Sequence, residues 1–258
     1  MNNITILMIL AVLPVLIILL YVYNSDRQKE PTKLLLQLFL MGILSCFVTL
    51  YLTEKVKIIF PFLHNKNNLF DIFLYSYIGI ALIEEFSKWI MVYYKGYNNK
   101  EFDESYDIII YSIFTSLGFA FFENIIYVMG KMTIKTALTR AISSVPAHAF
   151  VGLFMGYFLS LAKEASINNN KKEEKKNIIY SLLVPVIIHG SYDFCIISNN
   201  QLYIITFFIF LISLYIISLK KLHTEIKNNH QLKKTRFCKN CGYMLVSDVC
   251  EKCNTINK

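Results

Sequence analysis

Residues 4–23, ITILMILAVLPVLIILLYVY, form an uninterrupted apolar run without a single charged side chain. A helix needs about 20 such residues to cross the hydrocarbon core of a bilayer. The run therefore predicts a membrane-spanning helix, and six further segments of similar length and apolarity follow it. Their approximate bounds are 34–52, 69–94, 108–129, 137–162, 178–198 and 202–219.

The composition of the whole chain favours an all-α polytopic membrane protein with about seven such helices. Apolar residues make up 55% of the 258 residues and charged residues 17%, whereas a soluble fold needs more polar surface. These values exclude a soluble enzyme, a disordered chain and a disulfide-rich secreted module. The net charge of +8 lies mainly in loops and the tail, as the positive-inside rule predicts, so no nucleic-acid partner is expected.

The loop charges also predict orientation and domain organisation. Lysine and arginine are most frequent after the first, third, fifth and seventh spans, which places the N-terminus outside and the C-terminus in the cytoplasm of a cell-membrane protein. We expect a transmembrane domain over residues 1–219, a basic linker over 220–236 and a small separate unit over 237–258.

Ionisable residues inside the spans are concentrated in the third to the sixth. Charges at this depth are costly, so they indicate function by default. The third span carries Glu84, Glu85 and Lys88 in IALIEEFSKW, residues 80–89. Because Lys88 lies three and four residues after the two carboxylates, it can neutralise one and leave the other free to titrate. The structural alternative is a buried Glu–Lys pair that only fixes helix packing.

The fourth and fifth spans each add a candidate site residue. Glu123 lies in FAFFENIIY, residues 119–127, with Tyr127 one turn further on. The fifth span carries Arg140 near its start and His148 near its middle, and Pro146 is expected to free a backbone carbonyl and bend the helix beside this histidine. Each of Glu123 and His148 could instead serve only as a hydrogen-bonding group at a helix interface.

The sixth span places His189 and Asp193 on one helix face. At about 1.5 Å rise per residue, Glu84, His148 and His189 lie near the middle of their spans, and Glu123 and Asp193 lie about one turn toward the outside. Such a cluster suits activation of water by a glutamate, with histidine stabilising an oxyanion. It equally suits a zinc ion with an open position, and the spacings leave both chemistries open.

Four motifs in this order resemble those of the PrsW family of intramembrane proteases, within the group that includes the CAAX prenyl endopeptidases. The resemblance covers residues 70–198. The motifs are Glu84-Glu85-x-x-Lys88, Phe122-Glu123-x-x-x-Tyr127, Arg140 through His148 and Gly152, and His189-x-x-x-Asp193.

The resemblance implies an intramembrane endopeptidase that makes the first cut in a membrane-spanning anti-sigma factor. It implies that Glu84, Glu85 and His189 are catalytic, supported by Glu123, His148 and Asp193, with further support from Lys88, Tyr127 and Arg140. By analogy with the prenyl endopeptidases, it favours a glutamate-activated water over a catalytic metal.

The C-terminal unit contains Cys238-x-x-Cys241 and Cys250-x-x-Cys253. Two such pairs offer four thiolates for tetrahedral zinc, and Gly242 allows the turn after the first pair. This spacing predicts a structural zinc ribbon, since about 20 residues cannot build an adequate apolar core. A redox dithiol pair is the alternative.

Two other classes of function remain open at this point. A proton-coupled transporter also places glutamate, histidine and aspartate at the midplane of the bilayer, although we find no internal repeat in the spans. A non-catalytic membrane scaffold explains a zinc ribbon that binds a partner, but it does not explain the buried carboxylates.

Overall fold

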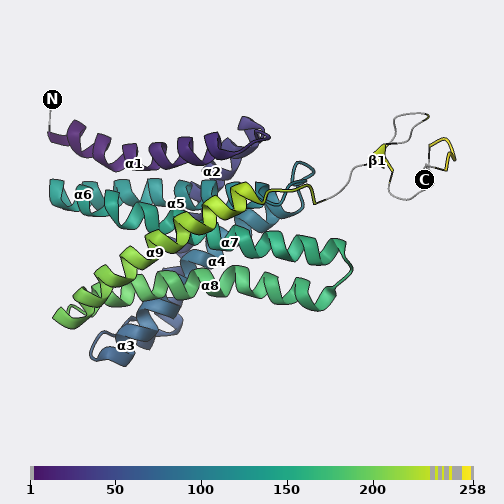
Figure 1. The fold of residues 1–258 in the computed structure, drawn as a ribbon. Helices are drawn as coiled ribbons and strands as arrows, with labels where there is room; N and C mark the ends of the chain where they lie inside the picture. Colours follow the sequence, from purple (N-terminus) through teal and green to yellow (C-terminus); the bar gives the residue numbers. More distant parts are fainter. Residues whose placement is uncertain (1–2, 233–235, 238–239, 241–243, 246–251, 257–258) are drawn as a thin grey trace.

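The computed structural model describes residues 3–232, 236–237, 240, 244–245 and 252–256. The elements before the centre of the chain are α1 (Asn3–Ser25), α2 (Thr32–Ile59), η1 (Pro61–His64), α3 (Leu69–Leu74), η2 (Tyr75–Leu82), α4 (Ile83–Val92) and η3 (Tyr93–Tyr97). They are followed by α5 (Asp107–Lys131), α6 (Ile134–Ile142), α7 (Ser144–Ile167), α8 (Lys171–Ile197), α9 (Gln201–Lys227), β1 (Arg236–Phe237) and β2 (Met244–Leu245). The helices form one bundle, in which α1, α5, α7 and α8 lie roughly along one direction and α9 crosses them obliquely (Figure 1).

The helical fold class predicted from the sequence is confirmed. Six helical segments of the described chain are long and apolar enough to cross a membrane, and they correspond to six of the seven predicted spans. The remaining one, predicted over 69–94, is also helical, but it is divided into α3, η2, α4 and η3. The segments η2 and η3 have the wider turns of a π-helix, a distortion that often accompanies functional sites.

The predicted fifth span consists of two helices, α6 and α7, which meet at Ser143. Pro146 has no N–H group, so it cannot donate to the carbonyl of Ile142 four residues earlier. The hydroxyl of Tyr215 from α9 donates to this carbonyl instead, at 2.5 Å. The expected effect of Pro146 is therefore confirmed, and the freed carbonyl fastens α9 to the break between α6 and α7.

Helix α5 lies at the centre of the bundle because glycines let its neighbours approach closely. A Cβ atom on Gly118 of α5 would lie 2.0 Å from the carbonyl oxygen of Phe39 in α2. On the other side, Gly152 and Gly156 of α7 lie against the backbone of α5, in the small-residue packing expected within membranes. This packing places α7, with His148, directly beside α5.

The C-terminal region is described only in part. Strands β1 and β2 pair antiparallel, but Cys238, Cys241 and Cys250 lie outside the described residues, so the zinc ribbon stays a prediction. Helix α9 continues to Lys227, and the first part of the expected linker is therefore helical. The residues that follow contact the loop before α5, where the Leu232 amide donates to the carbonyl of Asp103 at 2.7 Å.

Candidate active site

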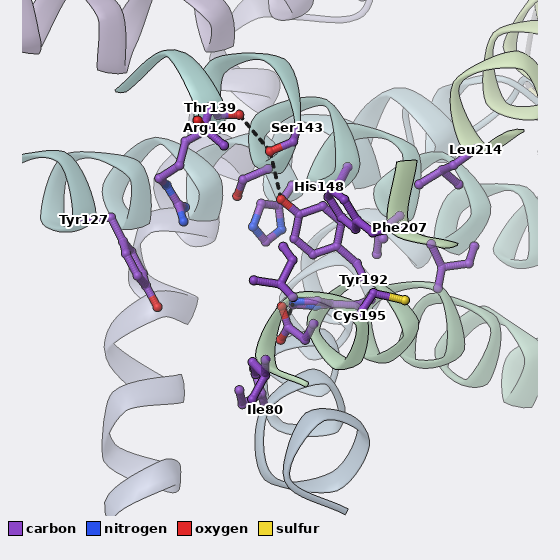
Figure 2. Close-up of a pocket in the computed structure, with 18 of the residues that line it drawn as sticks. Ile80, Tyr127, Thr139, Arg140, Ser143, His148, Tyr192, Cys195, Phe207 and Leu214 are labelled. Carbon is purple, nitrogen blue, oxygen red and sulfur yellow. Dashed lines mark hydrogen bonds and ion pairs between the residues drawn. The ribbon is translucent and has the colours of Figure 1, made fainter. Parts of the chain in front are cut away.

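A cavity of about 750 Å³ lies among η2, α4, α5, α6, α7, α8 and α9. Figure 2 shows that the polar side chains of α5, α6, α7 and α8 converge on it. The cavity has a polar floor and an apolar wall. The polar floor consists of Glu84, Glu123, Arg140, His148, His189 and Asp193, and the apolar wall includes Val151, Ile188, Ile204, Phe207, Phe208 and Leu214. The structure thus brings together the ionisable residues of four predicted spans.

Glu85 lies behind this floor and organises it. Its side chain is fully buried, and Oε1 accepts from the Lys88 ammonium at 2.5 Å and contacts Nδ1 of His189 at 2.6 Å. The Lys88 side chain is also fully buried and lies over the ring of Phe119. This buried carboxylate holds both partners in place, and its loss would leave the buried ammonium of Lys88 without its closest counter-ion.

Glu84 differs from its neighbour because it faces the cavity. Its side chain is 11% exposed, and its nearest cationic or imidazole nitrogens, Lys88 Nζ and His189 Nε2, each lie 3.8 Å from Oε2. Neither distance is a hydrogen bond, and Oε2 has no hydrogen-bond partner among the described residues. Of the two glutamates, Glu84 is therefore the one that lines the cavity and has acceptor capacity left there for a water or a substrate.

Glu123 contacts the side chains of two residues, Arg140 of α6 and His148 of α7. Arg140 donates to its Oε2 at 2.6 Å, and Nε2 of His148 lies 3.1 Å from the same oxygen. The guanidinium of Arg140 also lies 4.2 Å from the ring centroid of Tyr127. Figure 2 shows Tyr127, Arg140 and His148 lining the cavity. Because Glu123 forms an ion pair with Arg140 and lines the cavity, the alternative in which it is only a hydrogen-bonding group at a helix interface is disfavoured.

The contacts of His148 define its tautomer. Its Nδ1 lies 3.3 Å from Nζ of Lys88. Since an ammonium group only donates, Nδ1 must accept, and the ring proton belongs on Nε2, facing Glu123. The ring of His148 lies 5.5 Å from that of His189, nearly perpendicular to it, so the two imidazoles form one side of the site.

His189 lies between two carboxylates. In addition to the contact of Nδ1 with Glu85, its Nε2 lies 3.5 Å from Oδ2 of Asp193. An imidazole with an acceptor at each nitrogen can carry protons at both. The side chains of His189 and Asp193 both line the cavity from α8, so His189 can donate from Nε2 on the side of the ring that faces Asp193.

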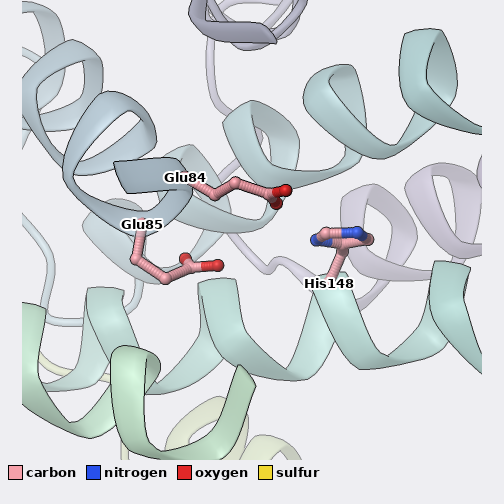
Figure 3. A group of neighbouring side chains, drawn as sticks. All are labelled: Glu84, Glu85 and His148. Carbon is pink, nitrogen blue, oxygen red and sulfur yellow. The ribbon is translucent and has the colours of Figure 1, made fainter. Parts of the chain in front are cut away.

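The same cluster has the donor set of a metal site. Ligand atoms of Glu84, Glu85 and His148 lie within 4.8 Å of one another, as Figure 3 illustrates. Two carboxylates and an imidazole are ligands that zinc prefers, and Oε2 of both glutamates lacks a hydrogen-bond partner among the described residues. These residues fit a metal ion, but Lys88 Nζ contacts all three, so a metal and the ammonium compete for this position.

Several residues of the cavity were not found by sequence reasoning. The hydroxyl of Tyr192 donates to Oγ of Ser143 at 2.9 Å, and Ser143 donates to the carbonyl of Thr139 at 2.7 Å; these bonds are dashed in Figure 2. They join α8 to the break between α6 and α7. Serine and tyrosine in apolar segments usually serve packing, so these residue types did not indicate a role in the site. One signal was present in the sequence, the position of Tyr192 beside Asp193.

Comparison with known proteins identifies the family of this chain. Residues 30–218 match the family described as PrsW family intramembrane metalloprotease. A protein named Protease PrsW from Oceanobacillus iheyensis is 33% identical over 83% of this chain and 94% of its own length. Proteins of the same name from Clostridioides difficile and Bacillus subtilis are 30% and 32% identical, over 88% and 77% of this chain and 93% and 87% of theirs. No solved structure matches the chain.

Proposed function

The chain belongs to the PrsW family of intramembrane metalloproteases and is a multi-pass membrane peptidase, and from this we propose that it cleaves a membrane-spanning segment of another protein with a water molecule activated by Glu84. The observation that carries the proposal is the environment of Glu84. It is a carboxylate on the floor of a cavity, with no hydrogen bond to any described residue and with His189 and Lys88 just beyond hydrogen-bond distance.

In the proposed reaction Glu84 acts as general base. It takes a proton from water, the water oxygen attacks the carbonyl carbon of the scissile peptide, and the carbonyl oxygen becomes an oxyanion. Nε2 of His189 faces the cavity and donates to this oxyanion. Glu84 then returns its proton to the leaving nitrogen as the C–N bond breaks, which completes hydrolysis and restores the carboxylate.

The remaining residues of the cluster hold these groups in position. Glu85 fixes Nδ1 of His189 and the ammonium of Lys88, and Asp193 faces the other nitrogen of His189. Glu123 anchors His148. Preorganisation of this kind is a large part of catalysis, because the donors need not reorient as charge develops.

A metal centre is the second candidate mechanism, favoured by the description of the family as metalloproteases. Glu84, Glu85 and His148 would hold the ion. When bound, a metal ion polarises the scissile carbonyl and lowers the pKa of water. Its binding requires Lys88 to move aside or to lose its proton. Replacing Lys88 with methionine should then raise the affinity for zinc, which equilibrium dialysis measures.

The shape of the cavity supports a membrane-embedded substrate. One side is apolar and formed by residues such as Phe207 and Leu214, and the floor is charged. An apolar segment can contact the wall while its backbone reaches the floor, where the peptide group meets polar partners that the bilayer lacks. We propose a single-span membrane protein as substrate and, from the family resemblance, the first cleavage of an anti-sigma factor.

The test uses the purified full-length chain in detergent with a panel of single-span membrane proteins that includes anti-sigma factors. Mass spectrometry should find a new fragment with the wild type and with Ser112→Ala, and none with Glu84→Gln. Ser112 is a matched control, because it is buried in α5 and its hydroxyl bonds the carbonyl of Ile108 in its own helix. An equal fragment from Glu84→Gln contradicts the proposed role.

Two further arms separate the other mechanisms. Cleavage that survives a chelator supports the glutamate mechanism, and cleavage that is lost and then restored by zinc supports a metal. This arm is repeated with Cys238→Ser, so that loss of a zinc ribbon is not mistaken for loss of a catalytic ion. Proton or solute movement in liposomes without any peptide product would instead favour the transporter.

A further inference from the structure

Asn124 lies next to Glu123 but outside the cavity, and both the nitrogen and the oxygen of its side-chain amide form hydrogen bonds. It is fully buried. Its Nδ2 donates to the carbonyl oxygen of Ala11 in α1 at 2.7 Å, and its Oδ1 accepts from Nε of Arg140 at 2.8 Å. The carbonyl can only accept and the guanidinium can only donate, so these partners fix the orientation of the amide.

Arg140 is consequently held at three points. Asn124 accepts from Nε, the carboxylate of Glu123 accepts from Nη2, and the guanidinium lies over the ring of Tyr127. The planar guanidinium presents its donors in a fixed fork. Without the bond to Nε, the group can rotate about its long side chain, and the donor that faces Glu123 loses its fixed direction.

The orientation of Arg140 affects His148, because both side chains contact the same carboxylate oxygen of Glu123. Oε2 of Glu123 contacts both Arg140 and Nε2 of His148. A change in the direction of the guanidinium therefore changes the carboxylate that fixes the imidazole. Asn124 contacts neither His148 nor the cavity, so its effect on them passes through Arg140 and Glu123.

The other end of the amide belongs to a helix outside the segment that matches the family. That match begins at residue 30, whereas Ala11 lies in α1. Ala11 is fully buried and packs with Leu7 of α1, Val128 of α5 and Ala137 of α6. This small apolar contact holds the carbonyl of Ala11 against the end of α5 that carries Asn124.

We propose that Asn124 is a positioning residue through which α1 orients Arg140, and with it the pair of Glu123 and His148, for catalysis. The proposal rests on the function proposed above, because its kinetic test requires cleavage. It assigns α1 a role in the site in addition to crossing the membrane. Asn124 makes no contact with substrate in this account, and its removal should change turnover more than binding.

The first arm measures cleavage by the full-length chain, with a substrate found in the panel above. Asn124→Ala should lower kcat about ten- to a hundredfold and change KM less than about twofold, since a misplaced catalytic group lowers turnover without removing substrate contacts. Ser112→Ala, in the same helix, should leave both constants unchanged. Lysine has no guanidinium and therefore no Nε–H to donate to Asn124. In an Arg140→Lys background, the effect of Asn124→Ala on kcat should therefore shrink to less than about threefold.

The second arm does not depend on cleavage. At fixed pH, the ring 15N signals of His148 in histidine-labelled protein report its hydrogen bond to Glu123, and the His148→Gln variant assigns them. Asn124→Ala should shift these signals, and Ser112→Ala should not. If the alanine variant does not fold, Asn124→Leu replaces it in both arms with the same expected directions, because leucine keeps the size of the side chain but can neither accept from Arg140 nor donate to Ala11.

The outcomes separate failure of this inference from failure of the proposed function. Cleavage by the wild type together with wild-type kcat and unshifted His148 signals in the Asn124 variant overturns the inference alone. Absence of any fragment from the wild type counts against the proposed function, and the 15N shift then decides whether Asn124 orients the cluster. An equal effect of Asn124→Ala in the Arg140→Lys background overturns the route through Arg140.

Discussion

Replacing Glu84 with glutamine separates the roles of the two adjacent glutamates. Glutamine has the same size, but it cannot accept a proton from water at neutral pH. Loss of a general base typically lowers turnover by about 10² to 10⁴, and we expect a loss of this size for Glu84→Gln. The free energy of unfolding should change little, because Glu84 makes no hydrogen bond to any described residue and its closest ion-pair contact is 3.8 Å.

The same substitution at Glu85 should lower both activity and stability. Glu85 contacts Lys88 at 2.5 Å and His189 at 2.6 Å, and its side chain is fully buried. Glu85→Gln leaves the buried ammonium of Lys88 without its closest counter-ion, and breaking a buried pair costs roughly 3–5 kcal/mol. For a chain of this length, that loss lowers Tm by on the order of 10 °C.

The assay pairs cleavage rates with thermal unfolding in one detergent. Glu173→Gln is the control, because Glu173 forms an exposed ion pair with Lys176 on α8, and neither rate nor Tm should change. An active Glu84→Gln variant with wild-type Tm would contradict the role of Glu84 as general base. So would a Glu84→Gln variant that loses as much stability as Glu85→Gln, since Glu84 would then be a structural partner of Lys88.

Three further predictions concern contacts outside the cluster of Glu84, Glu85 and His189. Tyr215→Phe removes the hydroxyl that donates to the carbonyl of Ile142, so the free energy of unfolding should fall by about 1 kcal/mol and lower Tm. KM should rise because α9 is held less firmly over the cavity; unchanged Tm and KM would contradict this. Gly118→Ala places a Cβ 2.0 Å from the carbonyl of Phe39, so α2 and α5 must separate, and thermal unfolding should show a loss of about 1–3 kcal/mol. Burial raises the pKa of Glu30 from 4.5 to about 7, so the folded chain holds this proton longer than the unfolded chain. The free energy of unfolding should therefore fall by up to about 3 kcal/mol as the pH rises from 4.5 through about 7. Glu30→Gln, which cannot ionise, should flatten the dependence of Tm on pH.

Much of the membrane domain could be predicted from residue types alone. Long apolar runs identify spans because the bilayer leaves the backbone only a helix or a barrel. The convergence of Glu84, Glu123, His148 and His189 was also predictable, since rise per residue places them at similar depth. The effect of Pro146 followed from its missing N–H group.

Other features depend on packing that one sequence does not reveal. Apolarity gives no signal for the wide turns of η2. Which of Glu84 and Glu85 faces the cavity depends on the rotation of α4 against α5 and α8, so spacing alone could not separate their roles. Asn124 donates to a backbone carbonyl of α1. Because every residue has such a carbonyl, the sequence gives no signal for this contact. The zinc ribbon, the anti-sigma factor substrate and the orientation of the termini stay predictions.

The role of Glu84 in activating water is best tested by cleavage of a single-span substrate in water enriched in 18O, analysed by mass spectrometry of both fragments. We expect the wild type to place one 18O in the new C-terminal carboxylate of the fragment, and Glu84→Gln, folded to the same Tm, to yield no fragment. A labelled fragment formed by Glu84→Gln at a rate near that of the wild type would contradict the claim that Glu84 activates the water.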